Sequence, residues 1–327
     1  MAELIEGKSV VVTGSGRGLG REIALLAASL GANVVVNDPG VNVDGSSQDQ
    51  GPADQVVQEI KAKGGAAVAN YDAVGTMDAG ERLIKTALDR FGRLDAVVNC
   101  AGILRDRMVF NMAEAEWDAV IQTHLKGHFS TIKPASIIFR QQRYGRIVNF
   151  SSISGLQGNA GQANYASAKA GIAGLTRAVS RDLGRYGVTV NAIAPIAQTR
   201  MAGTIPDAAR EQRARAGMQQ APARPPAELS PQGPEQVAPM TVYLLLDEAW
   251  NINGQIFQVA GGLIGRLNSP FPAVATVFKP GGYWAMDELR AVVPQQLMSN
   301  VPNAAPPPPD LSIPGRPAAV AEPVAAR

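Results

Sequence analysis

Short valine-rich runs alternate with longer helical patterns along most of this chain, and this alternation limits the possible folds more than any other feature. The runs that resemble strands are Ser9–Thr13, Asn33–Asn37, Ala66–Asn70, Leu94–Asn99, Gly145–Phe150, Val188–Ile193 and Gln255–Gly261. Helical patterns lie between them, at Gly18–Leu30, Asp78–Phe91, Glu114–Arg140 and Gln162–Tyr186. Mostly apolar strands are buried on both faces, and strands joined through helices pair in parallel. The sequence therefore predicts an α/β fold, a doubly wound parallel sheet with helices on both faces.

Two regions break this alternation. The segment Gly203–Pro234 is rich in Ala, Pro, Arg and Gln and holds few large apolar residues, so we interpret it as a substrate lid. After residue 267 the apolar periodicity fades, and from about residue 300 the Pro- and Ala-rich composition is typical of disordered, extended chain. The sequence predicts one folded domain over residues 1–267 and a C-terminal extension over residues 268–327, largely irregular.

Composition excludes several classes of function. A net charge of +2 over 327 residues does not suit a nucleic-acid-binding surface, which needs clustered basic residues. One cysteine, Cys100, and two histidines without metal-ligand spacing predict neither a disulfide nor a metal site. No apolar run is long enough to span a membrane, and neither a signal peptide nor a peroxisomal SKL ending is present. We expect a cytoplasmic protein.

A glycine-rich loop follows the first predicted strand and opens the first predicted helix. Three of the four glycines in TGSGRGLGRE, Gly14, Gly18 and Gly20, are spaced as GxxxGxG. Such a loop turns tightly, and its amides and the helix N-terminus attract a pyrophosphate. A glycine-rich turn alone is weak evidence for a dinucleotide site. This turn has a predicted strand before it and a predicted helix after it, and the combination predicts such a site.

The charges beside this loop bear on the choice of dinucleotide. Asp38 ends the second strand, where a carboxylate can bind the adenosine ribose and would repel a 2′-phosphate. Arg17 lies within the loop and could meet a 2′-phosphate. We give Asp38 more weight, which predicts NAD rather than NADP. The alternative role for Asp38 is to form a turn before Pro39 and Gly40.

The spacing of Tyr165 and Lys169 in NYASAK places a phenol and an ammonium on one helix face. A nearby ammonium favours the phenolate, so we expect Lys169 to lower the pKa of Tyr165 and make it a proton donor and acceptor. Ser152 stands thirteen residues earlier, after the predicted strand Gly145–Phe150. The alternative is a packed tyrosine beside a solvated lysine.

With the glycine loop, NCAG, Ser152, Tyr165 and Lys169 in this order, the chain resembles the short-chain dehydrogenase/reductase family from about Leu4 to Leu267. The resemblance implies a Rossmann-type sheet of seven strands, a nicotinamide cofactor and a homodimer or homotetramer. It implies that Tyr165 exchanges a proton with the substrate, that Ser152 binds the same oxygen, and that Lys169 binds the nicotinamide ribose. It also implies that Asp72 reaches the adenine, and that further cofactor contacts come from Ser15, Leu19, Ala73, Asn99, Ala101, Gly102, Pro195, Ile196 and Thr199.

A narrower resemblance is to the (3R)-hydroxyacyl-CoA dehydrogenase domain of peroxisomal multifunctional enzyme type 2, carried by VVVNDPG, AGILRDRM, HLKGHF and NGQIFQVAGGLIGRL. Like that subgroup, the chain has Pro195-Ile196 in place of Pro-Gly, and it has His124 where most of the family has an asparagine that props the middle helix. The resemblance implies that His124 takes this place in the catalytic site; the alternative is a core histidine. His128, four residues further on, is interpreted as a packing residue. The resemblance implies NAD-dependent oxidation of a 3-hydroxyacyl-CoA. The alternatives are oxidation of a 17β-hydroxysteroid or other secondary alcohol, NADPH-dependent reduction of a 3-oxoacyl thioester, and a cofactor-binding scaffold without activity.

Overall fold

The computed structural model describes residues 4–46, 51–197, 233–267, 275–278 and 286–299. The chain divides into two compact units, one of residues 1–210 with 220–269 and one of residues 211–219 with 270–327. The described part of the second unit contains helix α11 (Met286–Val292) and the π turn η7 (Val293–Leu297). Residues 203–232 of the predicted lid, Thr199 and the tail from residue 300 lie outside the described residues. No helix among the described residues is long and apolar enough to cross a membrane.

One sheet carries the first unit, in the strand order β3-β2-β1-β4-β5-β6-β7-β8. Pairing is parallel from β3 through to β7. Its strands are β1 (Ser9–Thr13), β2 (Asn33–Asn37), β3 (Ala66–Asn70), β4 (Ala96–Asn99), β5 (Gly145–Phe150), β6 (Val188–Ile196), β7 (Ile256–Ala260) and β8 (Leu263–Arg266). The order reverses between β1 and β4, which is where doubly wound sheets bind ligands.

The eighth strand departs from the predicted count of seven. β8 pairs antiparallel with β7, and Ala260 lies opposite Leu263. Two glycines, Gly261 and Gly262, make the turn, and Gly261 has a φ of +57°. Adjacent glycines between two apolar runs favour a tight hairpin, because the turn needs positive φ angles. This signal was present in the sequence, and its interpretation as a single strand was incomplete.

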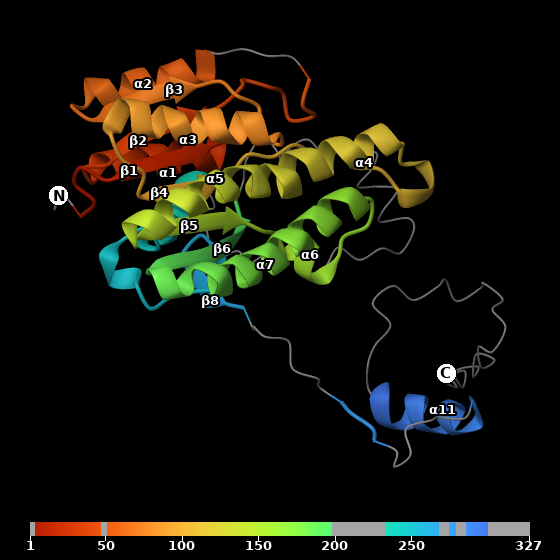
Figure 1. The fold of residues 1–327 in the computed structure, drawn as a ribbon. Helices are drawn as coiled ribbons and strands as arrows, with labels where there is room; N and C mark the ends of the chain where they lie inside the picture. Colours follow the sequence, from red (N-terminus) through yellow and green to blue (C-terminus); the bar gives the residue numbers. More distant parts are fainter. Residues whose placement is uncertain (1–3, 47–50, 198–232, 268–274, 279–285, 300–327) are drawn as a thin grey trace, which may run out of the picture. The chain divides into compact units, whose positions relative to one another are not determined.

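Helices cover both faces of the sheet (Figure 1). Those packed on one face are α1 (Gly18–Ser29), α2 (Gly51–Ala62) and α10 (Ala238–Tyr243). Those packed on the other are α3 (Met77–Phe91), α5 (Gly127–Gln142) and α7 (Ala163–Leu183). The remaining helical elements of the described first unit are α4 (Glu114–Ile121), α6 (Ile153–Gln157), the π turn η2 (Gln122–Lys126) and the short turns η1 (Val109–Asn111), η3 (Gly184–Tyr186), η5 (Pro234–Gln236) and η6 (Asp247–Ala249).

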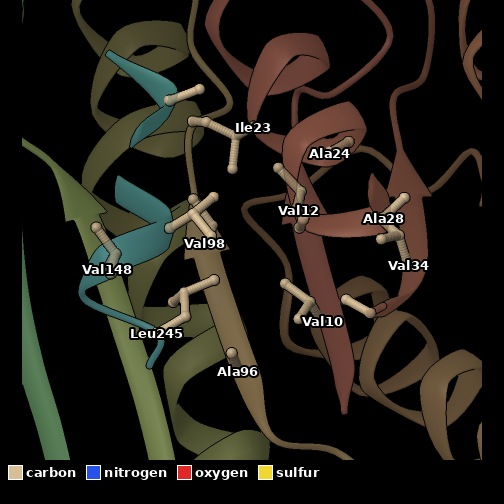
Figure 2. Close-up of a cluster of buried hydrophobic side chains, with 14 of the residues drawn as sticks. Val10, Val12, Ile23, Ala24, Ala28, Val34, Ala96, Val98, Val148 and Leu245 are labelled. Carbon is tan, nitrogen blue, oxygen red and sulfur yellow. The ribbon is translucent and has the colours of Figure 1, made fainter. Parts of the chain in front are cut away.

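Alternation along each strand divides the core between these two layers. On β1, Val10 and Val12 point to the layer of α1, while Val11 points to the layer of α3. Figure 2 shows the first of these clusters, in which Ile23 of α1 and Leu245 pack over the central strands. Burying each such aliphatic side chain contributes about 1.5–3 kcal/mol. The strands are held from both sides, so the loops at their carboxyl ends are placed rigidly.

A π turn interrupts the long middle helix. The sequence predicted one helix over Glu114–Arg140, but the structure has α4, then the π turn η2, then α5. π turns insert an extra residue into the helical register and occur frequently at functional sites. His124 lies in this turn and is buried.

Candidate active site

A cleft of about 420 Å³ opens at the carboxyl ends of the central strands. This volume lies within the range of about 300–1,000 Å³ common for small-molecule sites. Among the predicted site residues, those that line the cleft are Gly14, Arg17, Gly18, Leu19, Gly20, Asp38, Ala73, Ala101, Gly102, His124, Tyr165, Lys169 and Pro195. The fold thus brings the predicted dinucleotide loop and the predicted catalytic pair into one cavity.

Two predicted cofactor residues have side chains with partners outside the cleft lining. Asp72 Oδ1 accepts hydrogen bonds from Arg82 Nε and Nη2 at 2.8 and 2.6 Å. Asn99 is buried, and its amide donates to Asn149 Oδ1 at 3.0 Å and accepts from Thr131 Oγ1 at 2.6 Å. Their predicted contacts with a cofactor stay predictions.

Three further predicted residues, Ser15, Ile196 and Ser152, are not among the residues that line the cleft. The Ser15 hydroxyl donates to Val12 O at 2.7 Å and so fixes the start of the glycine loop. Ile196 ends β6 and pairs with Ala260. Ser152 precedes α6, and its hydroxyl accepts from Ser154 N at 3.1 Å.

The glycine loop has the geometry that a pyrophosphate requires. Gly14 has a φ of +64°, and a Cβ there would lie 2.7 Å from Ala101 Cα. Gly18 has a φ of +54° and open space where a Cβ would stand. Helix α1 begins there without a side-chain cap and without an acidic residue in its first turn. Uncapped amides at a helix N-terminus attract anions, so the residues present fit a dinucleotide phosphate.

Asp38 forms the predicted turn and also lies at the cleft, while its predicted contact with a ribose stays a prediction. Its Oδ2 accepts from Gly16 N at 2.9 Å, which ties it to the glycine loop. Its Oδ1 accepts from Gly40 N at 2.7 Å, which is the predicted turn. The residue also lines the cleft with Arg17, so forming the turn does not remove Asp38 from the site.

Tyr165 and Lys169 lie one turn apart on α7, as their spacing predicted. Lys169 Nζ lies 5.4 Å from the centroid of the Tyr165 ring and donates to Phe150 O, at the end of β5, at 2.6 Å. The ring of His124 meets that of Tyr165 edge-on, with centroids 5.1 Å apart. Helix α6 lies against the α7 backbone at this point, because a Cβ on Gly155 would be only 2.6 Å from Ala170 N. The π turn thus contacts Tyr165 through His124, and the end of β5 binds Lys169.

Burial shifts the pKa values of this pair in opposite directions. The pKa of Tyr165 rises to about 12, chiefly through desolvation, while a hydrogen bond with Ser152 lowers it and the Asp106 charge raises it. The pKa of Lys169 falls to about 8, also through desolvation. The direction that we predicted for the pKa of Tyr165 from the neighbouring lysine was therefore wrong, because desolvation by burial raises this pKa.

His124 lies in the π turn η2, and His128 lies in the first turn of the following helix, α5. His124 Nε2 lies 2.8 Å from Ile103 O and 3.1 Å from Ile103 N. Burial moves the pKa of His124 well below its usual value, so the titration near neutral pH that histidine could provide is not expected here. His128 is buried, and its Nδ1 donates to His124 O at 2.7 Å. This agrees with its interpretation as a packing residue.

The sequence analysis missed one wall of the cleft. Val41, Asn42, Val43 and Gly45, in the connection from β2 to α2, line it. Two hydrogen bonds hold this connection to the loop after β4. Leu104 N donates to Val43 O at 2.8 Å, and Arg105 Nε donates to Asp44 O at 2.9 Å. The length of the connection after Asn37 was the available signal, but loop length alone does not say where a loop packs.

Comparison with known proteins identifies the family. The model of the short chain dehydrogenases matches residues 8–210. The chain belongs to the short-chain dehydrogenase family. It is therefore an oxidoreductase that acts on CH–OH groups, and this family uses NAD or NADP.

Individual relatives of this short-chain dehydrogenase confirm the narrower resemblance. The mouse "Peroxisomal multifunctional enzyme type 2" is 43% identical over 262 residues, which cover 80% of this chain but 33% of that enzyme. The "Hydroxyacyl-CoA dehydrogenase ChsB1" of Mycobacterium tuberculosis is 41% identical over 278 residues, which cover 81% of each chain. A crystal structure of a short chain dehydrogenase from Mycobacterium avium matches with a TM-score of 0.75 and 43% identity, covering 93% of this chain and 98% of that one.

Proposed function

We propose that this short-chain dehydrogenase oxidises a 3-hydroxyacyl-CoA to the 3-oxoacyl-CoA with NAD. The observation that carries the proposal is the placement of Tyr165 and Lys169 in the same cleft as the glycine loop. Two relatives named for acyl-CoA or multifunctional peroxisomal chemistry support the thioester class.

Each proposed site residue has a separate part in the reaction. Oxidation breaks the C–H and O–H bonds at C3, so the hydride and the proton need separate acceptors. A bound nicotinamide dinucleotide would supply the hydride acceptor, with its pyrophosphate held by the amides at Gly14 and Gly18. Tyr165, as the phenolate, takes the proton from the substrate hydroxyl, and Ser152 holds the substrate oxygen. Lys169 supplies positive charge beside the phenol.

Coenzyme A carries phosphates, and arginine pairs well with them. Arg105 lines the cleft and can serve this purpose. Arg107 is paired with Glu116 at 2.9 Å, which makes it a weaker candidate. The arginines of the predicted lid, Arg210, Arg213, Arg215 and Arg224, lie outside the described residues.

The reverse reaction, reduction of a 3-oxoacyl thioester, is a second candidate. A phenol with a pKa of about 12 holds its proton at neutral pH and is ready to donate it to a carbonyl oxygen. The same residues serve both directions, so the cofactor and the conditions decide between them.

A steady-state assay tests the proposal across acyl-CoA chain lengths, 17β-hydroxysteroids and simple secondary alcohols, each with NAD and NADP. We expect the highest kcat/KM for a 3-hydroxyacyl-CoA with NAD. If free hydroxysteroids were oxidised far more efficiently than every thioester, the thioester assignment would be wrong. Absence of turnover with every substrate and both cofactors would instead favour a scaffold.

Cofactor preference is tested by removing the charge of Asp38 and keeping its size. In the Asp38→Asn variant we expect the NAD preference in kcat/KM to narrow by about 5- to 150-fold, the effect of losing about 1–3 kcal/mol of repulsion towards a 2′-phosphate. Asparagine keeps one acceptor oxygen for the two amides of Gly16 and Gly40, so the NADH dissociation constant, measured by fluorescence, checks whether the loop still binds the cofactor. Wild-type preference for NADP would show that Arg17 outweighs Asp38.

A further inference from the structure

A buried asparagine stands immediately before the tyrosine of the cleft and joins three segments. Asn164 is fully buried. Its Nδ2 donates to Arg105 O at 2.9 Å and to Glu116 O at 3.1 Å, and its Oδ1 accepts from Tyr165 N at 2.7 Å. Both amide hydrogens and the amide oxygen are therefore used, and each partner is a backbone group. This side chain connects the loop after β4, the first turn of α4 and the first turn of α7.

The loop held by Asn164 is Ile103–Arg107, and Tyr165 lies between its two attachments. At one end, His124 bonds Ile103 and packs its ring against Tyr165. At the other end, Asn164 binds Arg105 O, and Arg107 N donates to Gly161 O at 2.8 Å. The loop also carries cleft-lining residues. A movement of the loop would therefore shift the phenol and the substrate wall together.

We propose that Asn164 is a positioning residue, which fixes Tyr165 relative to the cleft wall Ile103–Arg107 so that its hydroxyl meets the substrate oxygen. This inference rests on the proposed role of Tyr165 in proton transfer. The amide suits the task because two carbonyl oxygens face its nitrogen and one N–H faces its oxygen. A carboxylate of the same size would set one negative oxygen against both carbonyls, and a leucine would leave all three backbone groups without their partner.

A second buried asparagine provides the matched control. Asn191 on β6 is also fully buried, donates to Ile252 O at 2.6 Å and accepts from Gln255 N at 3.0 Å. Its partners lie in the connection that leads to β7, and it does not line the cleft. Replacing it costs folding stability in the same way as replacing Asn164, without touching the loop Ile103–Arg107.

The experiment compares Asn164→Asp and Asn164→Leu with Asn191→Asp and Asn191→Leu. Misplacing a reacting group by about 1 Å can cost about 10²-fold in rate, so we expect both Asn164 variants to lose about 10- to 100-fold in kcat. The NADH dissociation constant should change less than about threefold, because the glycine loop is untouched, and the solvent deuterium isotope effect on kcat should rise as proton transfer becomes slower. The Asn191 variants should lose thermal stability but keep kcat within about threefold of wild type.

A second measurement does not depend on turnover. In the ligand-free protein, backbone amide exchange at Leu104 and Arg107 should accelerate in the Asn164 variants and not in the Asn191 variants. The inference is overturned if Asn164→Leu keeps wild-type turnover, if exchange at these amides is unchanged, or if both pairs of variants lose turnover equally. If wild type accepts another secondary alcohol and no thioester, the proposed substrate fails, while the same comparison on that alcohol still tests Asn164.

Discussion

Replacing Tyr165 with phenylalanine should lower kcat by about 10²–10⁴-fold, because transfer of a proton by a positioned group contributes about that much to the rate. Only the hydroxyl oxygen is removed, so the edge-on contact with His124 and the packing of α7 remain. Binding of NADH should stay within a few-fold of wild type, since the substitution leaves the glycine loop unchanged. Steady-state kinetics and a fluorescence titration measure the two quantities.

Tyr186→Phe is the matched control for this change. Its hydroxyl accepts from Arg185 Nη2 at 2.6 Å, and it is not among the residues that line the cleft. We expect this variant to keep wild-type turnover. A Tyr165→Phe enzyme that retained more than about a tenth of wild-type kcat would contradict the role given to Tyr165, since proton transfer then contributes less than its usual minimum.

Local sequence predicted the sheet well because each strand is specified by its own residues. Runs such as Ser9–Thr13 and Asn33–Asn37 are apolar on both faces, so no half-exposed arrangement competes with burial between two helix layers. The resulting register sets Thr13 beside Asn37 and Asn99, which aligns the loops that follow three strands. The glycine loop, Asp38 and Ala101 meet at one edge for this reason. The combination of predicted strand, loop and helix therefore sufficed to find the cleft.

Features that depend on contacts distant in sequence were not predictable in the same way. Nothing in the periodicity of Glu114–Arg140 indicates a π turn at His124, because the turn is stabilised where the imidazole meets Ile103 and Gly102. The pKa of Tyr165 is governed by desolvation, which depends on everything packed around the phenol. Asn164 was visible in NYASAK, but its three backbone partners come from segments that only the fold brings together.

Lys169 is an ammonium buried in the cleft, where the proposed function needs a positive charge and folding stability does not. Burial lowers the pKa of Lys169 from its ordinary 10.5 to about 8. Below pH 8 the lysine is charged in both states, and the folded protein bears the full cost of burying the charge. Between pH 8 and 10.5 the folded protein has released the proton while the unfolded chain retains it, so the free energy of unfolding should rise with pH in this window by about 2–4 kcal/mol.

A Lys169→Met substitution should therefore stabilise the ligand-free protein while it removes activity. The lost hydrogen bond to Phe150 O offsets about 1 kcal/mol, so we expect a net gain of about 1–3 kcal/mol at pH 7 by denaturant unfolding. This gain should shrink towards pH 10.5, where the wild-type lysine is neutral in the folded state. Turnover should fall by at least about 10²-fold, because the charge beside Tyr165 is gone.

Lys133→Met, which changes an exposed lysine on α5, should show neither the gain in stability nor its pH dependence. A Lys169→Met protein that was less stable than wild type by the same amount at pH 7 and pH 10 would show that the ammonium is not desolvated in the cleft. In that case, an interaction other than burial would have to set the protonation states of Tyr165 and Lys169. The expected result is the opposite, because burial desolvates the ammonium of Lys169 and lowers its pKa to about 8.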